Sequence, residues 1–525
     1  MENNKSPRPT SRREFIKWSS SIGLSVIAPS IAAEITEAKQ ERKVEKDKKE
    51  SKSNSQKPPE SDIHHYHPLE YEGIQENFEK FKKSNNHWAL YNYHLKETLK
   101  NNDLDEINIK VQTVGEKTNI KTTGGYDREI KGWKATRTEV NQLAEFGTIK
   151  NVPEFSEPAV RINDVSVKDL ERIADLSFTI NIMYIPPDPL VENNSQLSTS
   201  SSTTYRDIDD LRSGSFFNFN GTDYNVASHV QIGVIDTGYG DTPNESSPYV
   251  FSENHAEKIG ISEGDAKNFG EGNSWDNPEE GGDHGTKMAN IIAYMLDPNH
   301  NLGHSDLFIP LKVSYEGDDG NLKWSRSAIE SAIEYAEKEG IDVLNLSFGT
   351  GEWTICPTEY CKQYEGYRYS KYFGIASAGN DADQGSGVRD NSASTHNITI
   401  GGFSDDCSNG YEAYSSSQYG NVSYSNPGIG YECEYCSGYE YSEFHPHAYG
   451  CYHIKTDTNN YYSCGTSGAT AQATAIAAIM QSNYLYDFEK AKQIYSDMSS
   501  VNICPSSKSE QGQMLDAKYA YNQTK

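Results

Sequence analysis

Short apolar runs alternate with stretches of mixed polarity throughout residues 206–525. Near-continuous runs of branched and apolar residues predict buried strands at 230–235, 307–313, 341–346, 374–380 and 398–401. Residues 325–339 place Ile329, Ala332, Ile333 and Ala336 on one face, which predicts an amphipathic helix. Strands without polar alternation, separated by helices, are typical of a parallel sheet covered on both faces. The pattern predicts a three-layer α/β fold.

Two further predicted helices have almost no charge. Residues 472–480 are small or apolar, and residues 288–295 are mostly apolar. A helix without a polar face has no side that can meet water, so both helices should be buried within the domain. A more ordinary helix is predicted at 488–498, near the end of the chain.

Residues 66–192 carry a different pattern. Residues 107–114 alternate as a half-buried strand, and further strands are predicted at 159–162 and 178–185. Helical patterns at 140–146 and 168–175 separate them. This order predicts a small α+β unit. It is flanked by a Lys-, Glu- and Ser-rich spacer at 34–65, which should be disordered, and by an Asn-, Ser- and Thr-rich linker at 193–205, which should be exposed and cleavable.

The first 33 residues have the layout of an export signal. Arg12 and Arg13 precede a modest apolar stretch at 22–31, and Ala32 and Ala33 follow it. The stretch is too short and interrupted for a stable membrane span. A basic start, an apolar middle and a small-residue end are typical of a secretory signal. The paired arginines resemble the twin-arginine export signal, so we expect the twin-arginine export machinery as a partner and a secreted protein. A disordered basic tail is the alternative.

Three polar side chains stand where predicted elements begin or end. Asp236 follows the strand at 230–235, His284 precedes the helix that contains 288–295, and Ser467 stands at the start of the last buried helix. The N-terminus of a helix favours negative charge, so a serine there is a candidate nucleophile, although a simple helix cap is the alternative. Asp, His and Ser in this chain order are the order of subtilisin.

Four short segments carry a family resemblance: Asp236-Thr237-Gly238, His284-Gly285-Thr286, Ala378-Gly379-Asn380 and Gly465-Thr466-Ser467. Together and in this order they resemble the signature segments of the subtilisin-like serine proteases (subtilases, peptidase family S8).

The resemblance implies a subtilisin-like fold and a serine endopeptidase that hydrolyses polypeptides through an acyl-enzyme. Asp236, His284 and Ser467 would form the catalytic triad, and Asn380 would donate to the oxyanion. Ser347, Phe348 and Gly349 would pair with the substrate backbone. Catalysis of this type requires no cofactor.

The resemblance also assigns the domains. Residues 206–525 would form the catalytic domain, and 66–192 the propeptide, which would chaperone folding and inhibit the enzyme. A permanent accessory domain is the alternative for 66–192. For the whole chain, the alternatives are a non-catalytic peptide-binding protein or an esterase or amidase on the same scaffold.

Charge is concentrated in the C-terminal part. Residues 206–525 hold 19 Lys and Arg against 45 Asp and Glu, a net of −26 out of −28 for the whole chain. Such an acidic surface would repel a phosphate backbone, which argues against nucleic-acid binding. A soluble exported enzyme fits this balance.

All eight cysteines lie beyond residue 355, within the part predicted to be exported. Their even number favours disulfides. The rival is a structural zinc site formed by Cys433, Cys436, Cys451 and His453, because thiolates and imidazoles cluster there. Subtilases often hold structural calcium, and the acidic loops at 316–319 and 381–383 are candidates, although neither has a firm ligand spacing.

Overall fold

A computed structural model of the chain confirms the α/β prediction. It describes residues 63–64, 67–70, 72–122, 129–188, 190–191, 206–207, 230–238, 266–270, 284–296, 307–348, 373–380, 397–407, 410–413, 446–449, 451–455, 460–483, 485, 487–498, 500–501, 503–504 and 512–524. These residues belong to one compact unit. The predicted signal at 1–33, nearly all of the spacer at 34–65 and the linker at 193–205 lie outside them.

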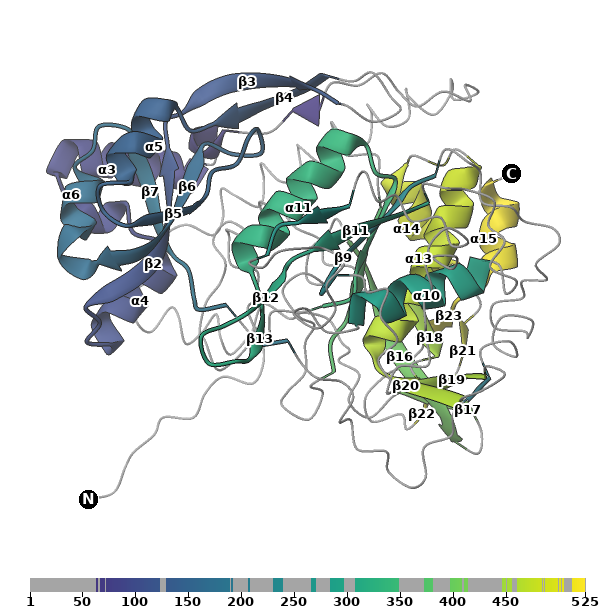
Figure 1. The fold of residues 1–525 in the computed structure, drawn as a ribbon. Coiled ribbons are helices and arrows are strands. Elements are labelled where there is room, and N and C mark those ends of the chain that lie inside the picture. The colour runs from purple at the N-terminus through teal and green to yellow at the C-terminus, as the bar shows by residue number, and fades with distance from the viewer. Residues whose placement is uncertain are drawn as a thin grey trace, which may run out of the picture. The chain divides into compact units, whose positions relative to one another are not determined.

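The main sheet is parallel over most of its width (Figure 1). Its strand order is β10-β11-β9-β14-β15-β16-β18-β23-β21, and only β21, at the end, runs antiparallel to its neighbour among these described strands. The strands span Lys267–Asn268 (β10), Phe308–Lys312 (β11), Ile232–Asp236 (β9), Val343–Leu346 (β14), Phe373–Ser377 (β15), Asn397–Cys407 (β16), Pro446–Tyr449 (β18), Gly512–Met514 (β23) and Ser500–Val501 (β21).

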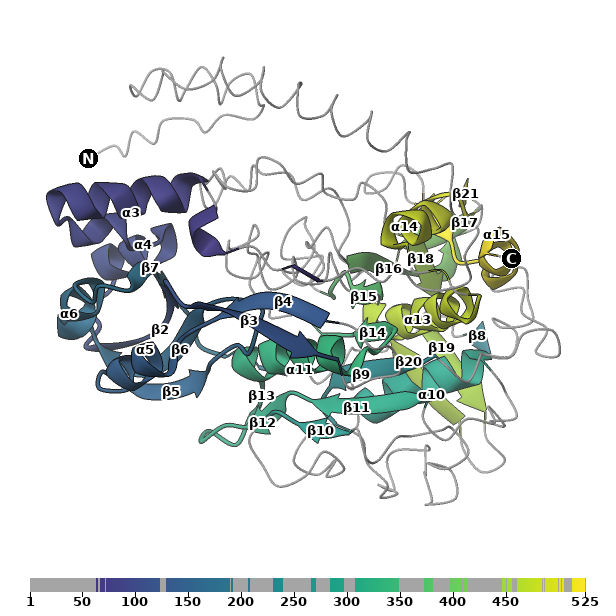
Figure 2. The ribbon, with the colours of Figure 1, turned by 90° about the horizontal axis from the view of Figure 1, so that it is seen from above.

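Both faces of this sheet are covered, because successive residues of its strands enter different cores. Ile232 and Val343 pack in one cluster with α10 (His284–Leu296) and α13 (Thr466–Ser482). Ile235 and Leu344 pack in another with α11 (Arg326–Glu339). α10 packs against α13, and Figure 2 shows the two helices beside each other. The alternation explains why these strands read as apolar without interruption.

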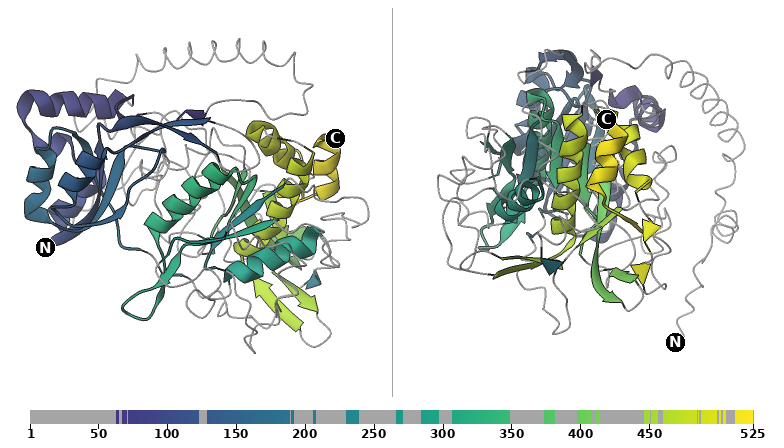
Figure 3. Two further views of the ribbon diagram at one scale, coloured as in Figure 1. Left: turned by 45° about the horizontal axis from the view of Figure 1, so that its top comes forward. Right: turned by 90° about the vertical axis from the view of Figure 1, so that its right-hand side faces the viewer.

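Smaller elements complete the C-terminal part. α14 (Phe488–Ser496) and α15 (Ala517–Thr524) add to the core around α13, and appear as the yellow helices in Figure 3. The remaining strands are β8 (Arg206–Asp207), β12 (Ser314–Glu316), β13 (Leu322–Trp324), β17 (Gly410–Ala413), β19 (Cys451–Lys455), β20 (Asn460–Cys464) and β22 (Ile503–Cys504). β12 and β13 form an antiparallel hairpin.

The N-terminal region is α+β, as predicted. Its antiparallel sheet has the order β5-β6-β2-β7, and a second sheet has the order β1-β4-β3. The strands are β1 (Ile63–His64), β2 (Glu106–Thr113), β3 (Glu116–Lys121), β4 (Glu129–Lys134), β5 (Thr148–Asn151), β6 (Ala159–Ser166) and β7 (Thr179–Tyr184). The helices are η1 (Pro68–Glu70), α3 (Glu72–Ser84), η2 (His87–Ala89), α4 (Tyr93–Asn101), α5 (Arg137–Leu143), η3 (Val167–Asp169) and α6 (Leu170–Ala174).

One expectation for this region differs from the structure. The alternation at 107–114 predicts a half-buried strand, yet β2 is buried on both faces from Ile109 to Thr113. Its apolar positions enter the core, and its polar Lys110 and Gln112 are buried as well, because they hydrogen bond or pair with other polar groups. α3 and α4 were not expected from the sequence pattern.

Candidate active site

Asp236 and His284 form a hydrogen-bonded pair at the meeting point of β9 and α10. His284 Nδ1 lies 2.8 Å from Oδ1 and 3.0 Å from Oδ2 of Asp236. The Asp236 side chain is 1% exposed and that of His284 is 16% exposed. An ionised carboxylate can only accept, so Nδ1 carries the proton and Nε2 is left with a free lone pair. Such an imidazole can act as a base at Nε2.

Neighbouring backbone groups fix this pair. The Thr237 N–H donates to Asp236 Oδ1 at 2.7 Å, and Thr237 Oγ1 accepts from the Gly285 N–H at 3.1 Å. A Cβ at Gly285 would come within 2.4 Å of the Gly238 carbonyl oxygen and 2.9 Å of Asp236 Cβ. The start of α10 therefore approaches the end of β9 at a distance that only glycine permits.

Ser467 lies in the first turn of α13, after a turn that requires glycine. Gly465 has φ of +144°, a conformation that other residues rarely adopt. The Ser467 hydroxyl is buried and donates to the Ser347 carbonyl oxygen at 3.0 Å, while Ser347 Oγ donates back to the Ser467 carbonyl at 3.2 Å. In this geometry the Ser467 hydroxyl is bonded to the backbone of Ser347.

Asn380 is held against the same turn. Its Oδ1 accepts from the Thr466 N–H at 2.9 Å and from Thr466 Oγ1 at 3.0 Å, and Thr466 Oγ1 accepts from the Gly379 N–H at 3.2 Å. A backbone N–H can only donate, so the oxygen of the Asn380 amide must face Thr466. Nδ2 is then the end that remains to donate to another group.

The parallel sheet explains why these groups meet. Asp236 ends β9, Ser347 follows β14, and Asn380 lies shortly after β15, and these three strands are adjacent and parallel. Their carboxyl ends lie at one edge, where ligands bind in such sheets. Phe348 is also placed there, whereas Gly349 lies outside the described residues.

Within the described ranges, no group of three His, Cys, Asp or Glu side chains could hold a metal ion. Cys433, Cys436, the loop 381–383 and the side chains of Cys451 and His453 lie outside what the structure describes, so the predicted zinc site and this calcium candidate stay predictions. In the loop 316–319, Asp319 accepts from the Asn321 N–H at 3.1 Å and pairs with Lys323 at 3.1 Å. These contacts lower the pKa of Asp319.

Comparison with known proteins decides the family. The sequence profile of the subtilase family, peptidase S8, matches residues 227–513, which is more than half of the chain. The chain belongs to the subtilase family. It is accordingly a serine protease of that family, acting on polypeptides. No curated protein matches this subtilase at a significant level.

Solved structures support the fold of this subtilase. An epidermin leader peptide processing serine protease from Staphylococcus aureus matches 80% of this chain and 98% of its own, at 17% identity and a TM-score of 0.50. Fervidolysin from Fervidobacterium pennivorans, a keratinolytic enzyme related to subtilisin, matches 80% of this chain and 62% of its own, at 15% identity and a TM-score of 0.51. At such identities the likeness establishes the fold alone.

Two positioning residues of this subtilase were not singled out from the sequence. Thr237 holds Asp236 and the start of α10, and Thr466 holds the amide of Asn380. Both lie inside the signature tripeptides, next to a predicted catalytic residue. Their position beside glycine in a tight turn was the available signal, because a threonine hydroxyl there can bond to nearby backbone groups.

Proposed function

We propose that this subtilase is a secreted endopeptidase, made as a zymogen, with Asp236, His284 and Ser467 as its catalytic triad. The observation that carries the proposal is the hydrogen-bonded Asp236–His284 pair at the same sheet edge as Ser467 and Asn380. Ser467 Oγ attacks the peptide carbonyl, while His284 Nε2 takes its proton and passes it to the leaving amine. Asp236 orients the imidazole and stabilises its charged form. Water then hydrolyses the acyl-enzyme.

The developing oxyanion needs donors that are already in place. Asn380 Nδ2 would supply one, because its amide oxygen is held by Thr466. The backbone N–H of Ser467, in the first turn of α13, would supply a second, and the helix dipole adds to both. Ser347 contributes to this step as well: a substrate N–H that bonds to its carbonyl oxygen competes with the Ser467 hydroxyl, which is then free to turn to His284.

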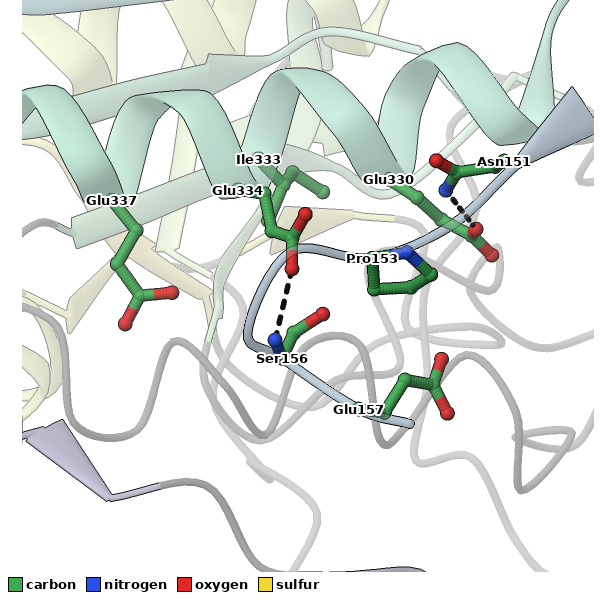
Figure 4. A pocket seen from close by; sticks show the side chains of 8 residues that line it. All are labelled: Asn151, Pro153, Ser156, Glu157, Glu330, Ile333, Glu334 and Glu337. Atoms are coloured by element: carbon green, nitrogen blue, oxygen red, sulfur yellow. Dashed lines mark hydrogen bonds between the residues drawn. The ribbon is translucent and has the colours of Figure 1, made fainter. Parts of the chain in front are cut away.

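Zymogen status is supported by a docking surface on α11, defined as Glu330, Ile333, Glu334, Glu337 and Lys338. Glu334 accepts hydrogen bonds from the backbone N–H groups of Glu154, Phe155 and Ser156 at 2.9, 3.1 and 2.9 Å. Figure 4 shows Glu334 directed at the loop that carries Ser156. Three backbone donors of the N-terminal region thus meet one carboxylate of the catalytic part.

Charges reinforce this docking. Glu330 pairs with Arg161 and lies 3.5 Å from Lys110, and Lys110 pairs with Glu157. All four side chains are at most 10% exposed. Burial opposes the ionisation of Glu330, but Arg161 and Lys110 outweigh it and lower the pKa of Glu330. Such binding fits a propeptide that dissociates from the catalytic part only after the chain between them has been cleaved.

Export and disulfides complete the proposal. They rest on the predicted twin-arginine signal at 1–33 and on the even number of cysteines. None of the described helices has the length and apolar character needed to cross a membrane. In the antiparallel pairing of β19 with β20, the backbone of Cys451 stands directly opposite that of Cys464. This pair is therefore the first to examine by mass mapping.

A fluorophosphonate probe tests the catalytic assignment. It should label Ser467 of the processed protein, and Ser467→Ala should abolish both labelling and cleavage of the chain near the linker. Ser482→Ala, at the far end of α13, is the matched control and should leave labelling unchanged. Labelling that persists in Ser467→Ala would refute the triad, and unchanged processing of that variant would refute self-activation.

A further inference from the structure

The chain that follows the N-terminal region lies along the β12–β13 hairpin. Leu190 forms an antiparallel bridge with Lys323, and the Val191 N–H donates to the Leu322 carbonyl oxygen at 2.8 Å. The other edge of β13 is paired with β12. Residues 190–191 therefore extend the hairpin as a third strand, in the way that an extended peptide adds to a sheet edge.

This hairpin is attached to the catalytic groups. The Val313 N–H donates to the Asp236 carbonyl oxygen at 2.9 Å, and the Ser325 N–H donates to the Val313 carbonyl oxygen at 2.9 Å. At the end of β13, the Trp324 ring packs on Phe348, with centroids 5.2 Å apart. Phe348 is next to Ser347, whose carbonyl oxygen accepts the hydrogen bond of the Ser467 hydroxyl. β13 is therefore one rim of the candidate active site, and residues 190–191 lie on that rim.

The Asp188 carboxylate is held by two donors beside this strand. Oδ1 accepts from the Arg326 N–H at 3.1 Å, and Oδ2 accepts from the Tyr315 hydroxyl at 3.2 Å. Arg326 is the first residue of α11, a helix of 14 residues, so its N–H has no partner within the helix. The cap residue Ser325 bonds to the Ala328 N–H instead. A carboxylate suits this position because it completes the hydrogen bonding of the helix and complements its dipole.

We propose that the Arg326 N–H and the Tyr315 hydroxyl form a subsite for an acidic substrate side chain. The bonds that this protease cuts most readily then lie a few residues after an Asp or Glu. This inference rests on the proposed function and names its substrate class. In the chain's own activation the acid is Asp188. Because residues 190–191 already lie beside β13, the proposal places the first bond cut shortly after them, within residues 192–196.

The test uses the processed enzyme and synthetic peptides covering residues 185–197, with Asp, Asn, Ala or Lys at position 188. We expect kcat/KM to fall about tenfold from Asp to Asn and further to Lys, because hydrogen bonds to a charged group are lost. Mass spectrometry of the Asp peptide should place the cut within residues 192–196. Equal kcat/KM for the Asp and Lys peptides would overturn the subsite, because Asp188 would then only help to dock the N-terminal region.

Tyr315→Phe removes one donor without changing the ring. It should reduce the preference for Asp over Asn several-fold, whereas the matched control Tyr335→Phe, on α11 outside the subsite, should keep the wild-type preference. An unchanged preference in Tyr315→Phe would show that the hydroxyl is not part of the subsite. Fluorophosphonate labelling distinguishes a failure of the proposed function from a failure of the subsite. If Ser467 is not labelled the proposed function fails, whereas normal labelling without acid preference overturns the subsite alone.

Discussion

The catalytic site and the α11 docking surface bring distant residues together in opposite ways. Catalytic side chains stand at the ends of strands and helices, and their supporting hydrogen bonds come largely from neighbours in the signature tripeptides, such as Thr237 and Thr466. The docking surface relies on long side chains in the middle of elements: Glu330 in α11 meets Arg161 in β6 and Lys110 in β2. One arrangement is specified by short motifs, and the other by a pairing of charges that are far apart in sequence.

The difference has an energetic side. At the catalytic site, polar groups are partnered by backbone donors in fixed positions, so a single substitution changes chemistry more than stability. At the docking surface, backbone donors also hold Glu334. The charges around Glu330, however, are removed from water and compensated by one another, so the loss of one partner leaves another buried without compensation. The two sites should therefore respond separately to substitution.

The largest effect on stability is expected from Arg161→Met, made in a Ser467→Ala chain that cannot process itself. Glu330 would lose the charge of Arg161 and keep Lys110, which it shares with Glu157, together with the hydrogen bond from Asn151. Breaking a buried ion pair in this way costs about 3–5 kcal/mol. Chemical denaturation should show this loss in the free energy of unfolding of the N-terminal region. Fluorophosphonate labelling of the same variant with Ser467 intact should still occur after processing.

Two variants control for this result. Arg172→Met removes an exposed ion pair with Asp169 and should change stability by less than about 1 kcal/mol. The double variant Arg161→Met/Glu330→Met leaves Lys110 paired with Glu157, so it should recover much of the loss. An Arg161→Met effect as small as that of Arg172→Met would show that the buried charges do not hold the docking surface together.

The second effect is on catalysis. Asn380→Asp keeps an oxygen for the Thr466 N–H and hydroxyl but removes the amide donor. We expect kcat to fall by at least about 10²–10³, the magnitude known for the equivalent donor of subtilisin, while docking and folding stay intact. Asn483→Asp, at the end of α13, is the matched control and should retain activity. A change in KM alone would argue that Asn380 serves substrate binding rather than the oxyanion.

The catalytic site and its sheet could be predicted from the sequence because local patterns specify them. Apolar runs predicted β9 and β14 to within two residues, because strands buried on both faces leave a local signal. The strand-end positions of Asp236 and Asn380 followed from those runs. Two positions that require glycine, the close approach at Gly285 and the turn at Gly465, kept the signature segments recognisable.

What could not be predicted depends on tertiary contacts. Lys110 fits the polar face of an alternating strand, and only the contacts with Glu157 and Glu330 reveal that it is buried. The β12–β13 hairpin has strands of three residues each, too short for a reliable periodicity, although it forms the rim that receives residues 190–191. Nothing local in the sequence marks Asp188 as the hydrogen-bond partner of Tyr315, which lies 127 residues away.

The smallest predicted effect is a pH dependence confined to the N-terminal region. Buried His67 donates from Nε2 to the Val114 carbonyl oxygen at 2.7 Å and accepts from the Leu69 N–H on Nδ1 at 3.0 Å, an arrangement that only the neutral ring can make. Burial lowers the pKa of His67 below 6.5, against the opposing effects of its bond to Val114 and of nearby Glu70 and Glu139. The unfolded chain therefore binds a proton first as the pH falls. The free energy of unfolding decreases from about pH 6.5 downward until the pH passes the lowered pKa of the folded state.

Unfolding of the Ser467→Ala chain measured between pH 8 and 5 should show this loss, and His67→Gln should reduce its slope. If His67→Gln keeps the full slope, the loss belongs to other groups and the separation between the two regions gains no support from pH.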